Sequence, residues 1–329
     1  MARTPLRVVS LLPSATDTVV ALGLESCLVG RSHECDWEQL ASLPALTSSR
    51  VGNLPVEQID AAFSASVAAV QEMTILGPAL AVPLLQYGLC VYHLDTDLLS
   101  QLKPDVILTC LQTAHSSILE GDLRDAALHA VLGYVPRVVH CAAEDLNGVW
   151  KDMQAVADAL GVSDKGRALV QQQQQAMNGA AASSRGRSHP RVVCVQWPHP
   201  MMAAGSWVPE MIALAGAEDV CGKINEAALI SESQLAEAKP DILVFALCGL
   251  PLEKAMQASQ AAIRRFKDVF AQLPAMKNHK VAVVDGEHVF SRPGPLLTPS
   301  IECLVEILHP EAQRYGHEGK LWKWMPPVA

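Results

Sequence analysis

The chain has 329 residues, half of them hydrophobic and 18% charged, which is enough apolar material for a core in each of two ordinary domains. Its formal net charge is −9 with no basic block against it, and this argues against a nucleic-acid-binding surface. Because no run of about 18 uncharged apolar residues avoids proline and glycine, the sequence predicts no membrane-spanning helix.

The N-terminus and the cysteines both bear on the cellular compartment. Met1 to Pro5 lead directly into an apolar run, without the basic, apolar and small-residue segments of a signal peptide. The nine cysteines include no Cys-x-x-Cys pair, and such a dispersed, odd set suits a reducing environment better than a disulfide framework. We therefore expect a cytoplasmic protein; a periplasmic or organellar location would require a leader before residue 1.

The first part of the chain, residues 1–143, alternates short β-branched runs with helical patterns, as βα units on a parallel sheet do. A helix is predicted after the first strand, with Ser14 or Thr16 as its N-cap, because a hydroxyl oxygen accepts hydrogen bonds from unpaired backbone amides. Residues 59–86 are predicted to be a helical insertion without a ligand role. The predicted strands are Val8–Leu12, Leu28–Arg31, Val106–Thr109 and Arg137–His140.

Residues 144–189 are predicted to connect two lobes through helices. We expect one helix over Asp145–Leu160, a break at Gly161, and a second helix from Ser163 to about Ala182. The second helix contains five consecutive glutamines, which could also form a low-complexity linker. Glutamine is a good helix former and apolar residues recur along this segment, so we favour a helix. At 20 residues it would span about 30 Å, the width of a small domain.

The last part, residues 190–329, repeats the plan of the first. Arg191–Pro198 is similar to Arg7–Ser14, and each half contains a Lys-Pro-Asp phrase before an apolar strand. Two similar parallel-sheet lobes, joined by one long helix, predict an α/β fold with a ligand cleft between the lobes. Binding is therefore the first function to consider. The predicted strands of this lobe are Val192–Gln196, Ile242–Phe245 and Val281–Val284.

Catalytic motifs are absent from the sequence. There is no Gly-x-Ser-x-Gly elbow, no glycine-rich phosphate loop, no His-Glu-x-x-His and no dinucleotide fingerprint, so we predict that the protein is not an enzyme. Polar and aromatic residues instead follow the predicted strands, at the position where open α/β sheets bind their ligands.

The loop Ser32–Trp37 follows the second predicted strand. His33, Glu34 and their next two neighbours are all types that can bind metals, but four adjacent residues cannot all face one ion. A packed loop with a hydrogen-bonded histidine explains them equally well, and we predict no metal ligand here. Trp37 is interpreted either as a flat apolar surface for a large ligand or as a packing residue.

The loop after Val106–Thr109 and its counterpart in the second lobe are also candidates. Gln112 and His115 follow the strand in the first lobe, and Cys248 and Gly249 occupy the corresponding place in the second. Gly249 would allow close approach of a ligand or backbone. Cys110 and Cys248 are either soft ligands or, as is commoner for isolated cysteines, small buried hydrophobes.

Aromatic residues with few rotatable bonds are concentrated in the loops of the second lobe. Trp197, Trp207 and Phe290 would give contact area at low entropic cost. Ser206 lies beside Trp207. Arg292 suits a phosphate or carboxylate, or alternatively a salt bridge that orders a proline-rich loop.

Several of these phrases together resemble the cobalamin-binding proteins of the helical-backbone (class III, TroA-like) ABC-transporter substrate-binding family. The resemblance covers nearly the whole chain, apart from the insertion and the C-terminal tail. It implies two α/β lobes joined by one long helix, a corrinoid held between them, and an ABC permease as partner. The phrases that carry it are Arg7–Thr16, Gly30–Asp36, Gly205–Glu210 and Arg292–Pro295.

The chain departs from that pattern in two places. It has no export signal, which transport members need to deliver cobalamin from the periplasm. Many relatives also have a Gln-Cys-x-x-Cys-like phrase after the third strand, where this chain has Leu111–His115, so no cysteine-based feature of that loop is carried over.

The leading hypothesis is therefore non-catalytic binding of cobalamin or a related corrinoid, with aromatic residues as apolar walls and polar ones at the ligand's periphery. One alternative is a metal, haem or siderophore receptor using His33, His115 or His199, although His199 is more simply a loop residue. Another is an enzyme or regulatory subunit that acts on a corrinoid or small metabolite. The predicted ligand-binding residues are Ser14, His33, Glu34, Trp37, Gln112, His115, Trp197, Ser206, Trp207, Cys248, Gly249, Phe290 and Arg292.

Overall fold

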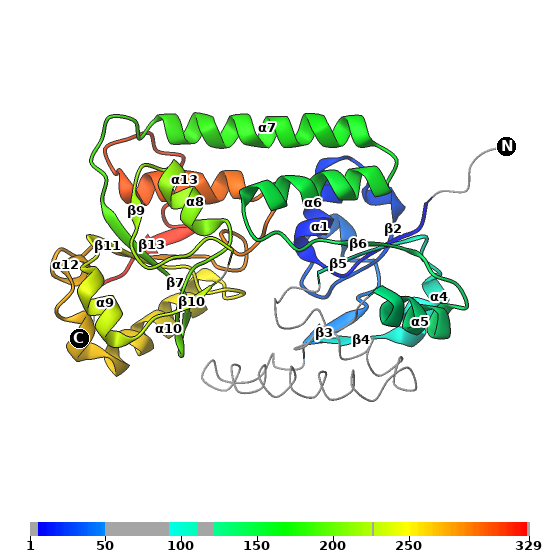
Figure 1. The fold of residues 1–329 in the computed structure, drawn as a ribbon, viewed down its shortest axis with the longest axis horizontal. Helices are drawn as coiled ribbons and strands as arrows, with labels where there is room; N and C mark the ends of the chain where they lie inside the picture. Colours follow the sequence, from blue (N-terminus) through cyan, green and yellow to red (C-terminus); the bar gives the residue numbers. More distant parts are fainter. Residues whose placement is uncertain (1–5, 50–91, 111–120, 226, 328–329) are drawn as a thin grey trace. The chain divides into compact units, whose positions relative to one another are not determined.

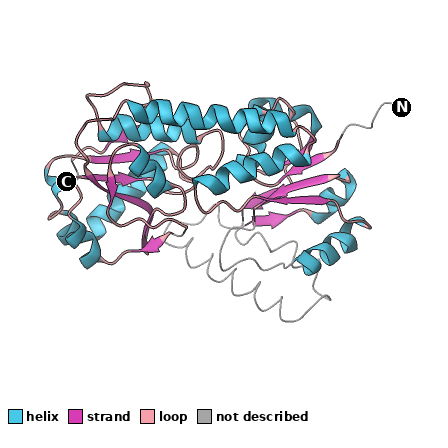
Figure 2. Cartoon of the chain, turned by 45° about the horizontal axis from the view of Figure 1, so that its top comes forward, coloured by secondary structure: helices cyan, strands magenta, loops and turns pink. Residues whose placement is uncertain are grey.

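The computed structural model describes residues 6–49, 92–110, 121–225 and 227–327 (Figure 1). The chain forms two compact units, residues 1–142 with 151–169, and residues 143–150 with 170–329. Each unit has its own sheet with helices packed around it (Figure 2), which confirms the predicted α/β fold with two parallel-sheet lobes. Within the described residues, no helix has both the length and the apolar character needed to cross a membrane.

The first unit is built on a four-stranded sheet in the order β2-β1-β5-β6, in which every pair of neighbours is parallel. All residues of β5 are buried, as expected for a parallel strand covered on both faces. A separate antiparallel pair, β3 and β4, was not predicted. The strands are β1 (Val8–Ser10), β2 (Leu28–Arg31), β3 (Thr47–Ser49), β4 (Tyr92–Leu94), β5 (Val106–Thr109) and β6 (Arg137–His140). The helices are α1 (Pro13–Ala21), α4 (Thr96–Leu102) and α5 (Gly121–Leu132), with 3₁₀ turns at Glu25–Cys27 and Glu38–Leu40.

The alternation of side chains along the strands gives this sheet two apolar cores. Val8 and Leu108 face one core, which also contains Val19 of α1. Val9 and Ile107 face the other, which contains Leu99 of α4. Since successive strand residues point to opposite faces, these β-branched and leucine runs place helices on both sides of the sheet.

The predicted N-cap of α1 is wrong. The helix begins at Pro13, whose ring fixes a helical φ at the first position, and its N-cap Leu12 makes no side-chain capping bond. Ser14 and Thr16 therefore lie inside the first turn, and both are buried. The Thr16 hydroxyl donates to Ser10 Oγ at 2.9 Å instead of capping the helix.

The second unit is built on a seven-stranded sheet in the order β10-β8-β7-β11-β12-β13, with β9 paired to β7. The parallel strands β7, β11 and β12 confirm the prediction, whereas the antiparallel strands β8, β10 and β13 were not predicted. The strands are β7 (Arg191–Pro198), β8 (Met201–Ala203), β9 (Glu218–Asp219), β10 (Ala228–Leu229), β11 (Ile242–Phe245), β12 (Val281–Val284) and β13 (Trp322–Trp324). The helices are α8 (Val208–Leu214), α9 (Glu232–Ala238), α10 (Leu252–Arg265), α11 (Lys267–Phe270), α12 (Pro274–Lys277) and α13 (Leu297–Leu308).

Two further helices, α6 (Leu146–Ala159) and α7 (Ser163–Ala182), each contribute residues to both units. The bounds of α7 match the prediction and include all five glutamines. Gly161, with φ of +74°, separates the two helices as predicted. The predicted insertion at residues 59–86 lies outside the described residues.

The Lys-Pro-Asp phrase performs the same task in both units. Lys103 ends α4 with φ of +45° and Lys239 ends α9 with φ of +46°, so each lysine is a left-handed C-cap. The proline that follows cannot continue a helix. The repeated phrase therefore stops a helix and begins a buried strand.

The aspartate of each phrase accepts a hydrogen bond from the start of the neighbouring strand segment. Asp105 Oδ2 accepts from the backbone amide of Arg7 at 2.8 Å, and Asp241 Oδ2 accepts from that of Arg191 at 2.9 Å. Both arginine side chains also donate to the last carbonyl of the helix that precedes each Lys-Pro-Asp phrase. Arg7 donates to the end of α4 at 2.7 Å, and Arg191 donates to the end of α9 at 3.0 Å. The internal repeat seen in the sequence is therefore a repeat of hydrogen bonds.

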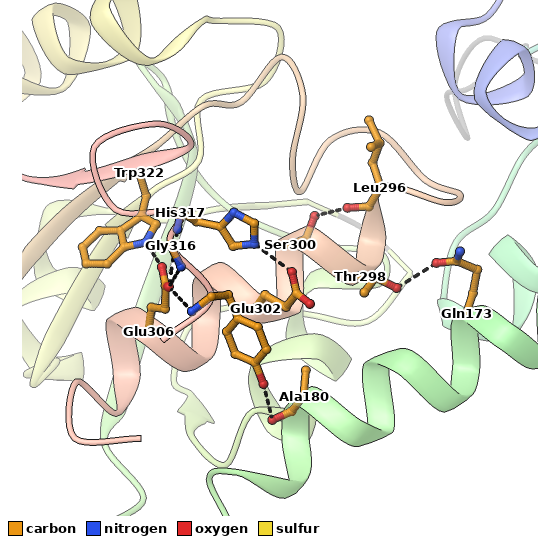
Figure 3. A network of polar contacts seen from close by, with 11 residues as sticks. Gln173, Ala180, Leu296, Thr298, Ser300, Glu302, Glu306, Gly316, His317 and Trp322 are labelled. Carbon is orange, nitrogen blue, oxygen red and sulfur yellow. Dashed lines mark hydrogen bonds and ion pairs between the residues drawn. The ribbon is translucent and has the colours of Figure 1, made fainter. Parts of the chain in front are cut away.

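A buried carboxylate anchors the C-terminal segment of the second unit (Figure 3). Glu306 of α13 is 5% exposed and accepts from the amide of Gly316 and the indole N–H of Trp322, each at 2.7 Å. The amides of Tyr315 and His317 point to the same carboxylate. Burial alone would raise the pKa of Glu306, but these four donors together lower it. This bonding holds Trp322, and with it β13, beside β12.

Replacing Glu306 tests this anchor. We expect Glu306→Gln to lower the free energy of unfolding by about 1.5–3 kcal/mol, since hydrogen bonds to a charged acceptor are lost. Because the pKa of Glu306 is lower in the folded state than its ordinary value of 4.5, the contribution is complete above that pH and is lost as the pH falls below it. Urea unfolding at several pH values measures both effects. The exposed Glu237→Gln is the matched control, and an equal loss in both variants would contradict the anchor.

Candidate functional site

Loop 32–37, defined as Ser32–Trp37, follows the carboxyl end of β2. The side chain of Arg31, the last residue of β2, forms hydrogen bonds with its backbone. The guanidinium of Arg31 donates from Nη1 to the carbonyls of Ser32 and Cys35, at 3.0 and 3.2 Å, and from Nε to that of Leu40 at 3.1 Å. A planar group with several donors in fixed directions suits such a set of carbonyls. Arg31 thus has a structural role that the sequence analysis did not identify.

Two buried hydroxyls, those of Ser32 and Thr47, also form hydrogen bonds with the backbone of the loop. Ser32 Oγ lies 3.1 Å from Thr47 Oγ1, and both residues are at most 5% exposed. Thr47 Oγ1 also accepts from the backbone amide of His33 at 3.0 Å, and Ser32 Oγ accepts from that of Glu34 at 3.3 Å. Because each buried polar group has a partner, the backbone of the loop is well determined.

The half-buried ring of His33 is fixed in orientation. Its Nδ1 lies 2.7 Å from Thr47 Oγ1, and its ring meets Tyr92 edge to face at 5.2 Å. The Tyr92 hydroxyl donates to Glu34 Oε1 at 2.7 Å, which links the ring to the exposed carboxylate beside it. Burial lowers the pKa of His33, with Arg31 acting in the same direction and Glu34 against it. The imidazole is therefore mainly neutral at neutral pH.

The other members of loop 32–37 point elsewhere. Cys35 is buried with its Sγ 3.0 Å from Thr16 Oγ1. Trp37 is half-buried, packs against the core that contains Val8, and donates from Nε1 to the buried Asp17 at 2.8 Å. Its part in packing is thus established, and its use as a ligand surface stays a prediction.

In the second unit, two of the predicted aromatic wall residues are buried. Trp207 is 6% exposed and donates from Nε1 to the carbonyl of Phe290 at 2.7 Å, while Phe290 is 1% exposed and donates from its amide to Ser300 Oγ at 3.0 Å. Both rings lie in the core of the unit because their loops are joined to each other and to α13. Their part in packing is thus established, and their use as walls for a ligand stays a prediction.

Backbone strain occurs in the same loops. Ser206 and Phe290 are non-glycine residues with φ of +54° and +67°. Such conformations persist only where the surroundings enforce them, and they are concentrated at functional sites. Ser206 is half-buried and remains a candidate. Arg292 is buried at 5% exposure, which favours its alternative role of ordering the proline-rich loop.

Trp197 differs from the other tryptophans. It is half-buried near the end of β7, where β7 and β8 form an antiparallel pair, with Trp197 opposite Met202. Its Nε1 is buried without a hydrogen-bond partner, one of few such atoms in the part of the chain that the structure describes. Such an unpaired donor costs free energy unless a ligand or water accepts from it.

The loops after β11 and β12 hold each other closely. Gly249, with φ of +72°, donates to the carbonyl of Gly286 at 3.0 Å, and Gly286 donates to that of Leu250 at 2.9 Å. A Cβ at Gly286 would lie 1.9 Å from the carbonyl of Leu247, so only glycine fits there. Cys248 is exposed beside this contact.

The remaining predicted residues lie in α1, in the loop after β7, or outside the described residues. Ser14 is buried in α1, and its carbonyl accepts from Thr18. His199 is half-buried, with its ring 6.1 Å from Phe266. Gln112 and His115 lie outside the described residues.

One group of metal-competent side chains was missed by the sequence analysis. The ligand atoms of Asp285, Glu287 and His288, after β12, lie within 4.8 Å of one another. Asp285 Oδ1 accepts from the amides of Glu287 and His288, each at 3.1 Å, and lies 3.0 Å from His288 Nδ1. Burial alone would raise the pKa of Asp285, and the bonds from His288 lower it. These bonds account for the cluster as a capped turn.

Comparison with known proteins identifies the fold. The family model for periplasmic binding proteins matches residues 8–287, while a search of curated proteins finds no match. A periplasmic haem-binding protein from Pseudomonas aeruginosa is similar, with a TM-score of 0.66 and 20% identity over 99% of this chain and 100% of that one. RhuT, the periplasmic haem-binding protein from Roseiflexus sp. RS-1, gives 0.65 and 19% over 94% and 100%. The vitamin B12-binding protein BtuF of Vibrio cholerae gives 0.59 and 17% over 92% and 96%.

The two indoles allow a matched test of the bonding described above. Trp207→Phe removes the donor to the Phe290 carbonyl in a buried loop, and we expect the free energy of unfolding to fall by about 1–3 kcal/mol. Trp197→Phe removes the same group where it has no partner, so its polar cost is near zero or favourable. Chemical denaturation of both variants measures the difference. Equal destabilisation would show that lost ring size, and not the hydrogen bond, decides the result.

Proposed function

The chain belongs to the periplasmic binding protein family, in its helical-backbone, TroA-like class, and from this we propose that it binds cobalamin or a related corrinoid without catalysis. The family consists of non-catalytic transporter binding proteins that bind small molecules and work with ABC permeases. A permease is accordingly the macromolecular partner we propose.

Loop 32–37 is the observation that carries the proposal. It contains most of the Gly30–Asp36 phrase that resembles cobalamin-binding proteins, and the structure holds it rigidly at the carboxyl end of a parallel strand. Ligands of open α/β sheets bind at this end. Rigidity before binding reduces the ordering cost that a large ligand would otherwise impose.

Charge favours a corrinoid over a haem. Glu34 and Asp36 are exposed in the loop, and the chain as a whole carries a net charge of −9. The amide side chains of a corrinoid are neutral and can donate to carboxylates, whereas the propionates of a haem are anionic and would be repelled.

Haem is the second candidate, supported by His33 and by the haem-binding proteins among the similar structures. A neutral, half-buried imidazole is a suitable ligand for iron. Both candidates are flat macrocycles that carry a metal.

Titration with cyanocobalamin and, separately, with haemin tests the proposal. We expect cyanocobalamin to release or absorb heat with a saturating one-to-one curve at micromolar protein and to change its visible spectrum. Haemin at the same concentration should bind more weakly, because of its propionates. If haemin binds and cyanocobalamin does not, haem is the ligand and the corrinoid proposal is wrong. The absence of heat and of a spectral change with either compound would overturn both candidates.

A further inference from the structure

Resting on the proposed function, we infer that Glu210 is a positioning residue whose carboxylate couples a ligand-binding loop of the second unit to helix α6. The loop, called loop 205–207, comprises Gly205–Trp207 and contains Ser206, the half-buried candidate for ligand contact. Glu210 ends the Gly205–Glu210 phrase of the sequence, and ligand contact alone gives it no task. Its task is to hold the loop and the first turn of α6 in one arrangement, so that a ligand that orders the loop also orders α6.

One hydrogen bond joins two helices that are distant in the sequence. Glu210 lies in the first turn of α8, and its Oε2 accepts from the backbone amide of Leu146, the first residue of α6, at 2.7 Å. A helix cannot satisfy this amide by its own bonds. Asp145 Oδ1 accepts from the amide of Gly148 at 2.6 Å, as an N-cap residue does. The start of α6 is therefore capped once from its own segment and once from α8.

The carboxylate of Glu210 lies at the N-terminal turns of two helices at once. It belongs to the first turn of α8 and contacts the first amide of α6, which has no acidic residue in its own first turn. The positive end of a helix macrodipole favours a negative charge, so both helices favour the carboxylate at this position. Within α8 the N-cap Trp207 makes no side-chain capping bond, so Glu210 is not part of a capping box there. The bond to α6 therefore distinguishes Glu210 from an ordinary acidic residue at a helix start.

Loop 205–207 is fixed on the other side of the same turn. The amide of Gly205 donates to Gln196 Oε1 at 3.4 Å, and its carbonyl accepts from the amide of Val208, the first residue of α8, at 3.1 Å. Ser206 between them has φ of +54°, a conformation that costs free energy and persists only where the surroundings enforce it. Most of α8 is buried in close packing, so the helix and the loop shift together. A shift of Glu210 at α6 therefore changes the support of Ser206.

Helix α6 extends from the second unit into the first. Leu146–Trp150 belongs to the second unit, whereas the helix from Lys151 onward belongs to the first. A Cβ at Gly148 would lie 3.0 Å from the Cα of Ala143, so the start of α6 packs closely on the segment before it. Ordering of loop 205–207 by a ligand lowers the remaining freedom of this helix start through Glu210. Coupling of this kind requires no large movement, since a change in local order is enough.

Affinity depends on the same bond. Without the Glu210 carboxylate, loop 205–207 adopts its strained, binding-competent form in a smaller fraction of molecules, and the apparent dissociation constant rises in inverse proportion to that fraction. A carboxylate that only stabilised α6 would lower the stability of the helix start and leave it insensitive to the ligand. These two roles predict different ligand dependence of exchange at the Leu146 amide.

The experiment measures hydrogen exchange of the Leu146 amide by NMR in the full-length protein, free and saturated with cyanocobalamin. In the wild type we expect cyanocobalamin to slow this exchange by at least about threefold, since the ligand orders the loop that α8 joins to α6. In Glu210→Ala the amide should exchange faster in the free protein, and cyanocobalamin should no longer slow it. The dissociation constant for cyanocobalamin should rise by roughly 3–10-fold. Glu210→Gln keeps an oxygen acceptor and should recover most of both losses.

Two variants control for charge and for the stability of α6. Glu232→Ala removes an exposed carboxylate from the first turn of α9, which has seven residues like α8, and this side chain has no hydrogen bond within the described residues. It should leave both measurements unchanged. Asp145→Ala removes the other cap of α6. It should speed exchange of Leu146 in the free protein, yet cyanocobalamin should still slow it because the Glu210 bond remains.

The outcomes separate this role from the proposed function. If the wild type binds cyanocobalamin but its Leu146 exchange does not change, the role of Glu210 is wrong and the corrinoid function stands; this result needs no variant to fold. Binding by Glu210→Ala as tight as that of the wild type, or equal losses in Glu232→Ala, would also overturn the role of Glu210 alone. Failure of the wild type to bind cyanocobalamin would overturn the corrinoid function and, with it, the coupling of corrinoid binding to α6.

Discussion

A parallel sheet buried on both faces leaves polar chemistry almost no place except the ends of its strands. In β5, β11 and β12 every residue is buried, so side chains with hydrogen-bonding or ligand-binding capacity must lie in the loops that follow. Loop 32–37 and the loops after β11 and β12 occupy these positions. The strand core thus determines where a site can form, and the loops determine which chemistry it has.

The same cost of unsatisfied polar groups organises the loops themselves. Thr47 and Ser32 share one hydroxyl pair, and the indole of Trp207 finds the carbonyl of Phe290. These bonds draw the side chains that make them inward, which removes Trp207 from the surface while it fixes the loop. Trp197 is the exception, since its buried N–H has no partner in the described part of the chain. An exception of this kind marks a place where a ligand or water completes the structure.

The central strands and α7 could be predicted because their signals are local. β-branched runs, the Lys-Pro-Asp phrases and the helix-forming glutamines are each decided within a few residues. The pair β3–β4 could not, since Thr47–Ser49 is short and polar and its partner is distant in the sequence. The burial of Phe290 was missed for a related reason: an aromatic residue in a loop has the same sequence signal whether its ring faces a ligand or a core. Thr47, which fixes His33, gives no sequence signal at all.

Stability and binding are coupled differently at the two sides of the His33 ring. At Nδ1 the hydroxyls of Thr47 and Ser32 support both the loop backbone and the imidazole, so a change there disturbs folding and ligand orientation together. At Nε2 the ring makes no hydrogen bond within the described residues, so this side of the ring does not support the loop backbone. A site arranged in this way meets its ordering cost during folding, before the ligand arrives. The free energy of the contacts that a ligand makes with this loop then contributes to affinity without being offset by reorganisation of the loop.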